Sequence, residues 1–574
     1  MIANHRKLLV LVMVPVLFII AFVYLIPGIN QPVNVYDEGI VAYSAVRVME
    51  GQVPYRDFWS IYSPAQFYGL AVAFKLFGTT INVERLWDTA MRAFVAVAAF
   101  LLVWRLSKPW AAFVVWAAVT IWVAYYTFSS QFHWVFYGYP AFPAIALCLF
   151  SILCLSIYFT NNRTAWLVAG GVILGFAALF RHDFGIYGAA GEGLTLVLYG
   201  LMRINTAPAV SERVGDKAAV VAAPLRANEP LAGMNSAKTA SSPGVRDKLL
   251  SVVQVIVPWA IGTLVIMIPV VIYFVVLTPL NELVYDLLIF PIETFPRFRG
   301  LPYPAFSFPN NLAFYLPFPV YLITAVVAVV QLRRRNFAYA FSLLSLIIFG
   351  LFSFNQARVR ADLIHTPAFF LPALIMITIL LGGVPRREGE SADAAQVLSA
   401  VALLLIVVVL AQPLGDRAAL LANDKLMHPI IANDLERSQT AIVNTNMVAA
   451  VHFIDDNTSP QDKIYVGNAT HDRIFINEPM FYFLAERDAA TRYHELHPGV
   501  ATTAPVQTEI AGDLEKYQVK YLVLTNAYER VREPNQSAIS SGVKILDNYI
   551  ADHYVPVMQY GPYTIWKRRK IVPR

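Results

Sequence analysis

Two adjacent carboxylates, Asp37 and Glu38, are the first residues of the chain whose type and setting point to chemistry. They begin the segment DEGIVAYSAVRVMEGQVPYRDFWSIYSP. A carboxylate beside a hydroxyl group can act as a general base, and aromatic rings provide flat surfaces for sugars. The alternative is that the pair only complements the dipole of a helix that starts there and ends near Gly51. The side chains just downstream suit a sugar phosphate: Tyr55, Arg56, Asp57, Trp59 and Tyr62.

Arginines that could hold a phosphate recur in three later segments. Their planar fork binds phosphate oxygens in pairs, which suits a leaving group that gains negative charge. Arg181 belongs to FRHDFG with Asp183, and the alternative there is a helix-end ion pair between those two residues. The candidate phosphate ligands are Arg92, Arg181, Arg358 and Arg360.

Asp362 and His365 lie three residues apart in ARVRADLIH. That spacing puts both on one face of a helix, where they could bind a metal ion, clamp a substrate or form a structural pair. The roles of Glu192, which lies within an apolar run, and of His133 stay open. The sequence therefore proposes no definite cofactor, and it leaves a divalent metal ion open.

The elements that must position these residues are apolar helices. The chain has 574 residues, 57% hydrophobic and 14% charged, and its mean hydropathy is +0.54. Since a bilayer-crossing helix needs about 20 apolar residues, the sequence predicts about eleven transmembrane helices. The predicted spans are 8–27, 87–104, 109–128, 137–159, 164–180, 184–201, 250–278, 312–332, 336–354, 364–384 and 396–412.

Basic residues cluster at alternate ends of these runs. An inside amino terminus puts Arg6, Lys7, Arg105, Arg163 and the arginines at 333–335 on the cytoplasmic side, as the positive-inside rule predicts. The net charge of +6 is therefore a topology signal and gives no reason to expect a nucleic-acid partner. We expect a multi-pass membrane protein with a cytoplasmic amino terminus and an outer carboxy-terminal domain.

Two expected units follow from these spans: a transmembrane part, 1–412, and an outer α/β domain, 413–574. The β-rich runs KIYVGNA, KYLVLTN and GPYTIWKR indicate the strands of that domain. A first outer loop, 28–86, contains a predicted interfacial helix with Ser63 as N-cap, Pro64 at its start and Gly78 at its end. A second outer loop spans 279–311, and the inner loop 203–248 has the composition of a disordered tether.

The order of these features resembles the GT-C superfamily of glycosyltransferases. An Asp-Glu pair follows the first span, and the continuation through PYRDFW to KLFG is similar to bacterial members of that superfamily. The nearest likeness is to dolichyl-phosphate-mannose protein mannosyltransferases (glycosyltransferase family 39) and their bacterial relatives that use undecaprenyl-phosphate sugars. The carboxy-terminal segments also resemble the outer domains of those transferases.

That resemblance implies a GT-C fold with juxtamembrane helices in the first outer loop and a function in the bacterial cell envelope, in the inner membrane. The enzyme would transfer a monosaccharide from a polyprenyl-phosphate carrier to a glycolipid, glycan or protein on the outer face, with inversion. Asp37 would be the general base, and Glu38 would position the acceptor or help hold a metal ion. Two alternatives remain: a lipid or sugar transporter or flippase, and a non-catalytic binder of lipid-linked sugar.

The predicted topology can be tested with reporter fusions after residues 240 and 430. A reporter enzyme that is active only outside the membrane should be active when fused after residue 430 and inactive when fused after residue 240. A cytoplasmic reporter should give the opposite pattern. Both fusion points reporting from the same side would contradict the topology.

Overall fold

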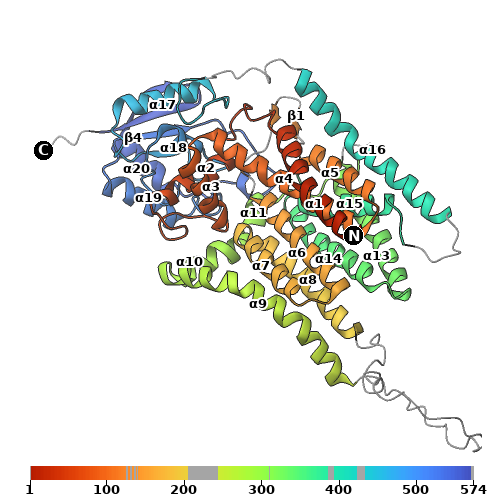
Figure 1. Ribbon diagram of the computed structural model, residues 1–574. Coiled ribbons are helices and arrows are strands. Elements are labelled where there is room, and N and C mark those ends of the chain that lie inside the picture. Colours follow the sequence, from red (N-terminus) through yellow and green to blue (C-terminus); the bar gives the residue numbers. More distant parts are fainter. Residues whose placement is uncertain are drawn as a thin grey trace, which may run out of the picture.

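The computed structural model describes residues 2–203 and 244–569, except 124–126, 130–131, 135–137, 139, 309–310, 363, 386–392 and 423–432. Figure 1 shows a large bundle of helices beside a smaller part that carries the carboxy-terminal strands, with α2, α3 and α11 close to the boundary between them. The loop predicted to be disordered, 203–248, lies almost wholly outside the described residues.

Each predicted apolar run coincides with a helix in the described residues. These helices are α1 (Ile2–Leu25), α4 (Ile81–Leu106), α5 (Pro109–Val123), α6 (Ala141–Asn161), α7 (Ala165–Phe180), α8 (His182–Arg203), α9 (Val245–Leu277), α13 (Pro317–Arg333), α14 (Phe337–Val359), α15 (Pro367–Leu381) and α16 (Asp393–Ala422). A short hairpin between α5 and α6 pairs β1 (Thr127–Ser129) with β2 (Phe132–Trp134).

Five helices in the described residues are long and apolar enough to cross a membrane: α4, α6, α9, α14, and α13 together with α12 (Leu312–Tyr315). Several predicted spans form shorter apolar helices, among them α5, α7 and α15. Exposed Leu, Ile and Val side chains cover much of α1, α9 and α16. Large apolar surfaces on long helices suit hydrocarbon rather than water, so the chain is an integral membrane protein.

The first outer loop contains the two helices that the sequence predicts, α2 (Asp37–Met49) and α3 (Ala65–Phe77). Gly51 and Gly78 follow them with φ of 86° and 99°, a conformation that costs glycine least. The predicted N-cap of α3 is wrong. Pro64 occupies the N-cap, and the Ser63 hydroxyl instead accepts a hydrogen bond from the His182 amide at 2.8 Å, which ties this loop to the start of α8.

The second outer loop is helical along most of its length. It contains α10 (Leu280–Val284), a π-helix η2 (Tyr285–Thr294) and α11 (Phe295–Arg299). Pro291 lies inside the π-helix, where it cannot donate a backbone hydrogen bond. Wide turns of this kind occur often at functional sites.

The carboxy-terminal residues form a four-stranded sheet with helices. Its strand order is β3 (Tyr465–Asn468), β4 (Tyr521–Thr525), β6 (Tyr563–Arg568), β5 (Tyr554–Tyr560); β3 and β4 are parallel and the other neighbours antiparallel. The three strands expected from the β-rich runs are present, and β5 was missed. The other elements are α17 (Thr445–Asn457), α18 (Met480–Ala485), α19 (Ala504–Lys516), η4 (Gln536–Ala538) and α20 (Ile545–His553).

The first outer loop and the carboxy-terminal elements share one hydrophobic core. Tyr43 of α2 stacks on Tyr482 of α18 with ring centroids 5.1 Å apart, and the Tyr43 hydroxyl accepts a hydrogen bond from the Ala489 amide at 2.7 Å. Gly39 permits this approach, because a β-carbon there would lie 2.3 Å from the Met480 nitrogen. The start of α2 is therefore fixed against the sheet-bearing part.

A buried ion pair fixes the start of α2 against α4 as well. Arg85 and Glu38 are fully buried, and the Arg85 guanidinium binds both Glu38 oxygens at 2.6 and 3.0 Å. The same guanidinium donates to the carbonyls of Ile29 and Gln31 at 2.6 and 2.7 Å. One arginine thus holds both the chain after α1 and the first turn of α2.

Glu38→Gln should destabilise the protein strongly, because it leaves the Arg85 charge buried without a carboxylate. Breaking a buried pair from one side typically costs about 3–5 kcal/mol. Thermal unfolding of the purified protein in detergent should show a clearly lower midpoint. Asp434→Asn, which disrupts an exposed pair with His452, is the control and should change little. Equal midpoints for Glu38→Gln and the control would contradict this role of the pair.

Candidate active site

Asp37 is the first residue of α2, and its neighbours set its direction. The Asn34 side-chain oxygen accepts from the backbone amides of Tyr36 and Asp37 at 3.1 and 3.0 Å, and the Asn34 amide donates to Asp37 Oδ2 at 3.3 Å. Gly138 lies against the same turn, where a β-carbon would be 2.7 Å from Glu38 Cα. Successive helix residues point about 100° apart, so Glu38 enters the protein toward Arg85 while Asp37 faces a cavity.

This cavity has a volume of about 350 Å³, within the range of small-molecule sites. Four parts of the chain that are far apart in sequence meet around it: the first outer loop, the start of α8, the stretch from η2 to α11, and the end of α14 with the residues that follow. Its polar lining residues are Asp37, Tyr62, Arg181, His182, Asp183, Tyr187, Arg299, Asn355, Gln356, Arg360, Asp362 and His365.

The Asp37 carboxylate is half-buried at the wall of the cavity. Burial raises the pKa of Asp37, and the charges of Arg299, His365 and Arg360 and the Asn34 hydrogen bond offset this only in part. A carboxylate whose pKa is raised holds a proton more tightly than an exposed one and is a better general base, provided it is ionised at the working pH.

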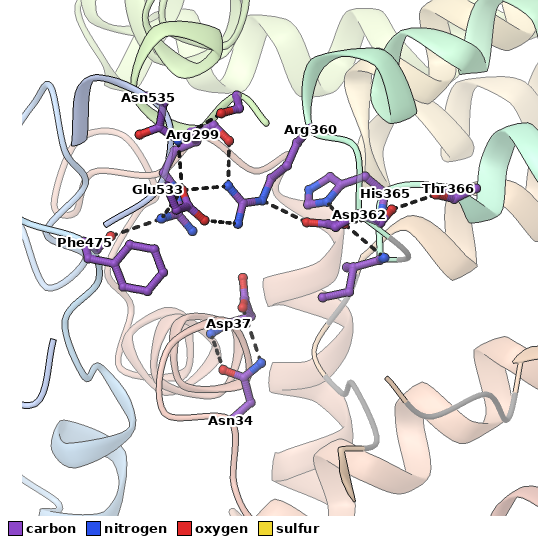
Figure 2. A network of polar contacts seen from close by, with 12 residues as sticks. Asn34, Asp37, Arg299, Arg360, Asp362, His365, Thr366, Phe475, Glu533 and Asn535 are labelled. Atoms are coloured by element: carbon purple, nitrogen blue, oxygen red, sulfur yellow. Dashed lines mark hydrogen bonds and ion pairs between the residues drawn. The ribbon is translucent and has the colours of Figure 1, made fainter. Parts of the chain in front are cut away.

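Three guanidinium groups face the cavity from different elements. Arg181 pairs with Asp183 at 2.6 Å, and Arg360 pairs with Asp362 at 3.0 Å and with Glu533 at 2.6 Å. Figure 2 shows Arg299 and Arg360 side by side near Glu533, with Asp37 facing them across a gap. These positions put positive charge opposite the carboxylate.

Arg299 has the most free donors toward the cavity. Its Nη1 donates to the Phe475 carbonyl at 3.2 Å and lies 3.7 Å from Glu533 Oε2. Among the described residues its Nε and Nη2 have no protein partner. In Arg360, by contrast, Nε donates to Asp362, Nη1 to the Arg299 carbonyl and Nη2 to Glu533. Arg299 is therefore the best-placed anion ligand of the three.

Asp362 and His365 form a pair with each other, 2.7 Å apart, at the edge of the cavity. Although burial alone would raise the pKa of Asp362, His365 and Arg360 hold this pKa at about 2. Asp362 thus stays ionised and holds the turn before α15, since its Oδ1 also accepts from the amides of Ile364 and His365. These contacts fit a structural pair that also presents His365 to the cavity.

Other predicted site residues lie elsewhere. Arg92 is buried against Asp88 at 2.6 Å and the Val123 carbonyl, and Arg358 is exposed with Asn355 as its hydrogen-bond partner. Tyr55 is buried and donates to the Tyr62 carbonyl. Arg56 and Asp57 pair with each other on a separate polar surface. Glu38 is committed to Arg85, so none of these side chains lines the cavity of Asp37.

Sequence reasoning missed Arg299, Gln356 and Glu533. Arg299 lies in FPRFRG, near the end of a loop whose composition is rich in Pro, Phe and Tyr. The presence of two arginines there, Arg297 and Arg299, could have indicated an anion-binding site. Gln356 donates to Asp183 across the helix ends. Glu533 approaches from the carboxy-terminal part, and nothing in its local sequence marks that contact.

The described residues do not suggest a metal centre. Within them, no three His, Cys, Asp or Glu side chains lie close enough together to hold an ion. The oxygens of Glu38 already bind Arg85, and Asp362 already binds His365. A divalent ion stays a prediction.

The arrangement can bind an anion and remove a proton beside it. Arginines placed where negative charge develops stabilise a leaving group, and a carboxylate a few ångströms away can take a proton from an incoming hydroxyl. The apolar lining residues Ile186, Leu288 and Ile292 are 56%, 43% and 71% exposed on the outside of the protein. The cavity therefore reaches an apolar surface between α8 and η2.

No protein-family model matches the sequence, and no curated protein matches it at a significant level. Solved structures do show similarity. ArnT from Cupriavidus metallidurans, solved with undecaprenyl phosphate, is 15% identical over 99% of each chain, with a TM-score of 0.49. The archaeal oligosaccharyltransferase AglB from Archaeoglobus fulgidus, solved with an inhibitory peptide and a dolichol-phosphate, is 11% identical over 98% of this chain and 75% of that one, also with a TM-score of 0.49.

Proposed function

We propose that the chain is a membrane glycosyltransferase with a GT-C fold of about eleven spans. It transfers a monosaccharide from a polyprenyl-phosphate carrier to a hydroxyl of a glycolipid, glycan or protein on the outer face of the membrane. One observation carries the proposal: a single cavity combines a half-buried carboxylate, three guanidinium groups and apolar walls that reach the lipid-facing surface.

Asp37 acts as the general base in this reaction. The acceptor oxygen attacks the anomeric carbon of the donor sugar and forms the new glycosidic bond. As that bond forms, the hydroxyl proton passes to Asp37, and the bond between the anomeric carbon and the phosphate oxygen breaks. One displacement from the face opposite the phosphate inverts the anomeric centre, as the sequence resemblance implies.

The arginines stabilise the departing polyprenyl phosphate. The bond electrons leave with the phosphate, whose charge changes from about −1 to −2, and fixed cations lower the energy of that change. Arg299 offers two nitrogens that have no partner among the described residues, and Arg181 and Arg360 add positive charge to the same cavity. Asp37 remains separate from the cations, so that it can face the acceptor.

The apolar opening accounts for the lipid part of the donor. A polyprenyl chain is insoluble in water and must stay in the bilayer while its headgroup reacts. Ile186 of α8 and Leu288 and Ile292 of η2 border the cavity and are exposed, so a chain lying between these elements would stay in hydrocarbon. The outer position of this cavity follows from the predicted topology, with the amino terminus inside.

A transporter or flippase is the rival class. It would use charged groups within the spans, and Glu192 of α8 is such a group. Its Oε2 accepts a hydrogen bond from Trp259 Nε1 of α9 at 2.8 Å, in a buried helix interface apart from the cavity. Glu192 does not line the cavity of Asp37, so we favour transfer chemistry at Asp37. A non-catalytic binder would use the same cavity without turnover.

Asp37→Asn should abolish transfer while leaving donor binding nearly intact, because an amide cannot accept the proton. A lost general base typically costs about 10²- to 10⁴-fold in rate. Single-turnover transfer from a radiolabelled polyprenyl-phosphate sugar would measure this loss. The unmutated protein should lose kcat/KM as the pH falls through a pKa above the ordinary aspartate value, because only ionised Asp37 is active.

The matched control for this experiment is Asp462→Asn, a carboxylate paired with Lys520 outside the cavity. It should transfer sugar at the unmutated rate. Transfer by Asp37→Asn at that same rate would remove Asp37 as the base.

Arg299→Gln should weaken binding of undecaprenyl phosphate by about 10- to 100-fold, since a hydrogen bond to a charged group is worth about 1.5–3 kcal/mol. Titration of the lipid phosphate into protein in nanodiscs would give the dissociation constants. Arg358→Gln is the comparison, because that guanidinium is exposed and does not line the cavity, and it should bind as the unmutated protein does. A larger loss in Arg358→Gln than in Arg299→Gln would overturn this assignment.

A further inference from the structure

Each arginine that lines the cavity, in the part of the chain that the structure describes, is paired with a carboxylate other than Asp37. Arg181 pairs with Asp183, Arg360 with Asp362 and Glu533, and Arg299 with Glu533. Asp37 forms no ion pair among the described residues, and its one side-chain hydrogen bond comes from the Asn34 amide at 3.3 Å. A base that must accept a proton benefits from this separation, because a guanidinium bound to it would make it a weaker base.

Glu533 is the shared partner of two of these arginines. Its Oε1 accepts from Arg360 Nη2 at 2.6 Å, its Oε2 accepts from Arg360 Nη1 at 3.1 Å, and Arg299 Nη1 lies 3.7 Å from Oε2. Figure 2 shows this carboxylate beside the guanidinium groups of Arg299 and Arg360, with Asp37 across a gap from them. Glu533 therefore gives both cations a carboxylate partner other than the base.

The loop that carries Glu533 is held in place by its own contacts. Asn535 Nδ2 donates to Glu533 Oε2 and to the Gly300 carbonyl, both at 2.9 Å, and Asn535 Oδ1 accepts from the Ser537 amide at 3.0 Å. Although burial alone would raise the pKa of Glu533, hydrogen bonds from Arg360 and the charge of Arg299 hold it below its usual value. The carboxylate is thus both ionised and anchored.

We propose that Glu533 is a positioning residue whose carboxylate keeps Arg299 and Arg360 in ion pairs, so that neither guanidinium pairs with Asp37 and the base stays available. This inference rests on the proposed function, which assigns the base role to Asp37. It gives the loop between β4 and α20 an indirect part in the reaction, because the carboxy-terminal part supplies the counter-charge of the two arginines.

Loss of Glu533 has a definite structural consequence. Among the residues that the structure describes, Arg360 would keep Asp362 as its one carboxylate partner, and Arg299 would keep none. Asp37 is the carboxylate that faces both across the cavity, so the guanidinium groups would turn toward it. Other groups near Asp37 remain unchanged. Asn34, Tyr36, His365 and Glu495 interact with it, and Arg181, His182, Asp183 and Asp362 line the same cavity.

Infrared titration of full-length protein in nanodiscs tests the proposal without requiring turnover. The carboxyl band of Asp37 is the one that disappears in Asp37→Asn. In Glu533→Gln its protonation midpoint should fall by about 1 pH unit or more, as expected when a carboxylate gains an arginine partner. Glu533→Asp should restore most of the midpoint, and Asn535→Ala, which loosens Glu533 without removing its charge, should give a smaller shift of the same sign.

Glu515→Gln is the matched control, since Glu515 pairs with Arg568 in the same carboxy-terminal part but does not line the cavity. It should leave the Asp37 midpoint unchanged. An unchanged or higher midpoint in Glu533→Gln, or the same shift in Glu515→Gln, would overturn the proposal. If the unmutated protein transfers no sugar, the proposed function fails, whereas the infrared result still decides whether Glu533 keeps the cations from Asp37.

Discussion

The position of Asp37 depends on the buried ion pair between Glu38 and Arg85. Two charges without access to water cost several kcal/mol each unless they meet, and here both oxygens of the carboxylate meet one guanidinium. The same guanidinium binds main-chain carbonyls after α1, so the chain between α1 and α2 has little freedom. Two adjacent acidic residues thus have different tasks, because the helix turns one toward α4 and the other toward the cavity.

Much of the fold could be predicted because it follows from local patterns. Apolar runs give helices α1, α4–α9 and α13–α16 in the expected places, and glycines at positive φ follow α2 and α3 where the sequence indicates. The helices of the second outer loop were not predicted. Ser63 shows the limit of local reasoning. Its type fits an N-cap, but the structure uses its hydroxyl for a contact 119 residues away.

Some residues of the candidate site could be predicted from local sequence patterns, and others could not. Asp37, Arg181 and Arg360 come to one cavity because each lies where a helix begins or ends. Arg92 and Arg358 have the same residue type at similar places, but the rotation of each helix turns them into the protein or into solvent, and sequence alone does not give that rotation. Glu533 joins the site through tertiary contacts with Arg299 and Arg360, which no local pattern encodes.

The carboxy-terminal part packs against the membrane part and also forms ion pairs with it. Tyr43 and Gly39 of α2 pack against α18, and Glu533 reaches the arginines of the cavity from the loop before α20. The boundary expected at residue 413 separates two compositions, yet the residues on either side form a common core and a common site. Changes in the outer elements should therefore affect chemistry at the membrane surface.

An experimental structure of the full chain in nanodiscs with undecaprenyl phosphate would test the central claim most directly. The account predicts density for the phosphate between Arg299 and Arg181, next to but not touching Asp37, with the lipid chain leaving between α8 and η2. A phosphate bound elsewhere, with the Asp37 cavity closed or filled by side chains, would contradict it.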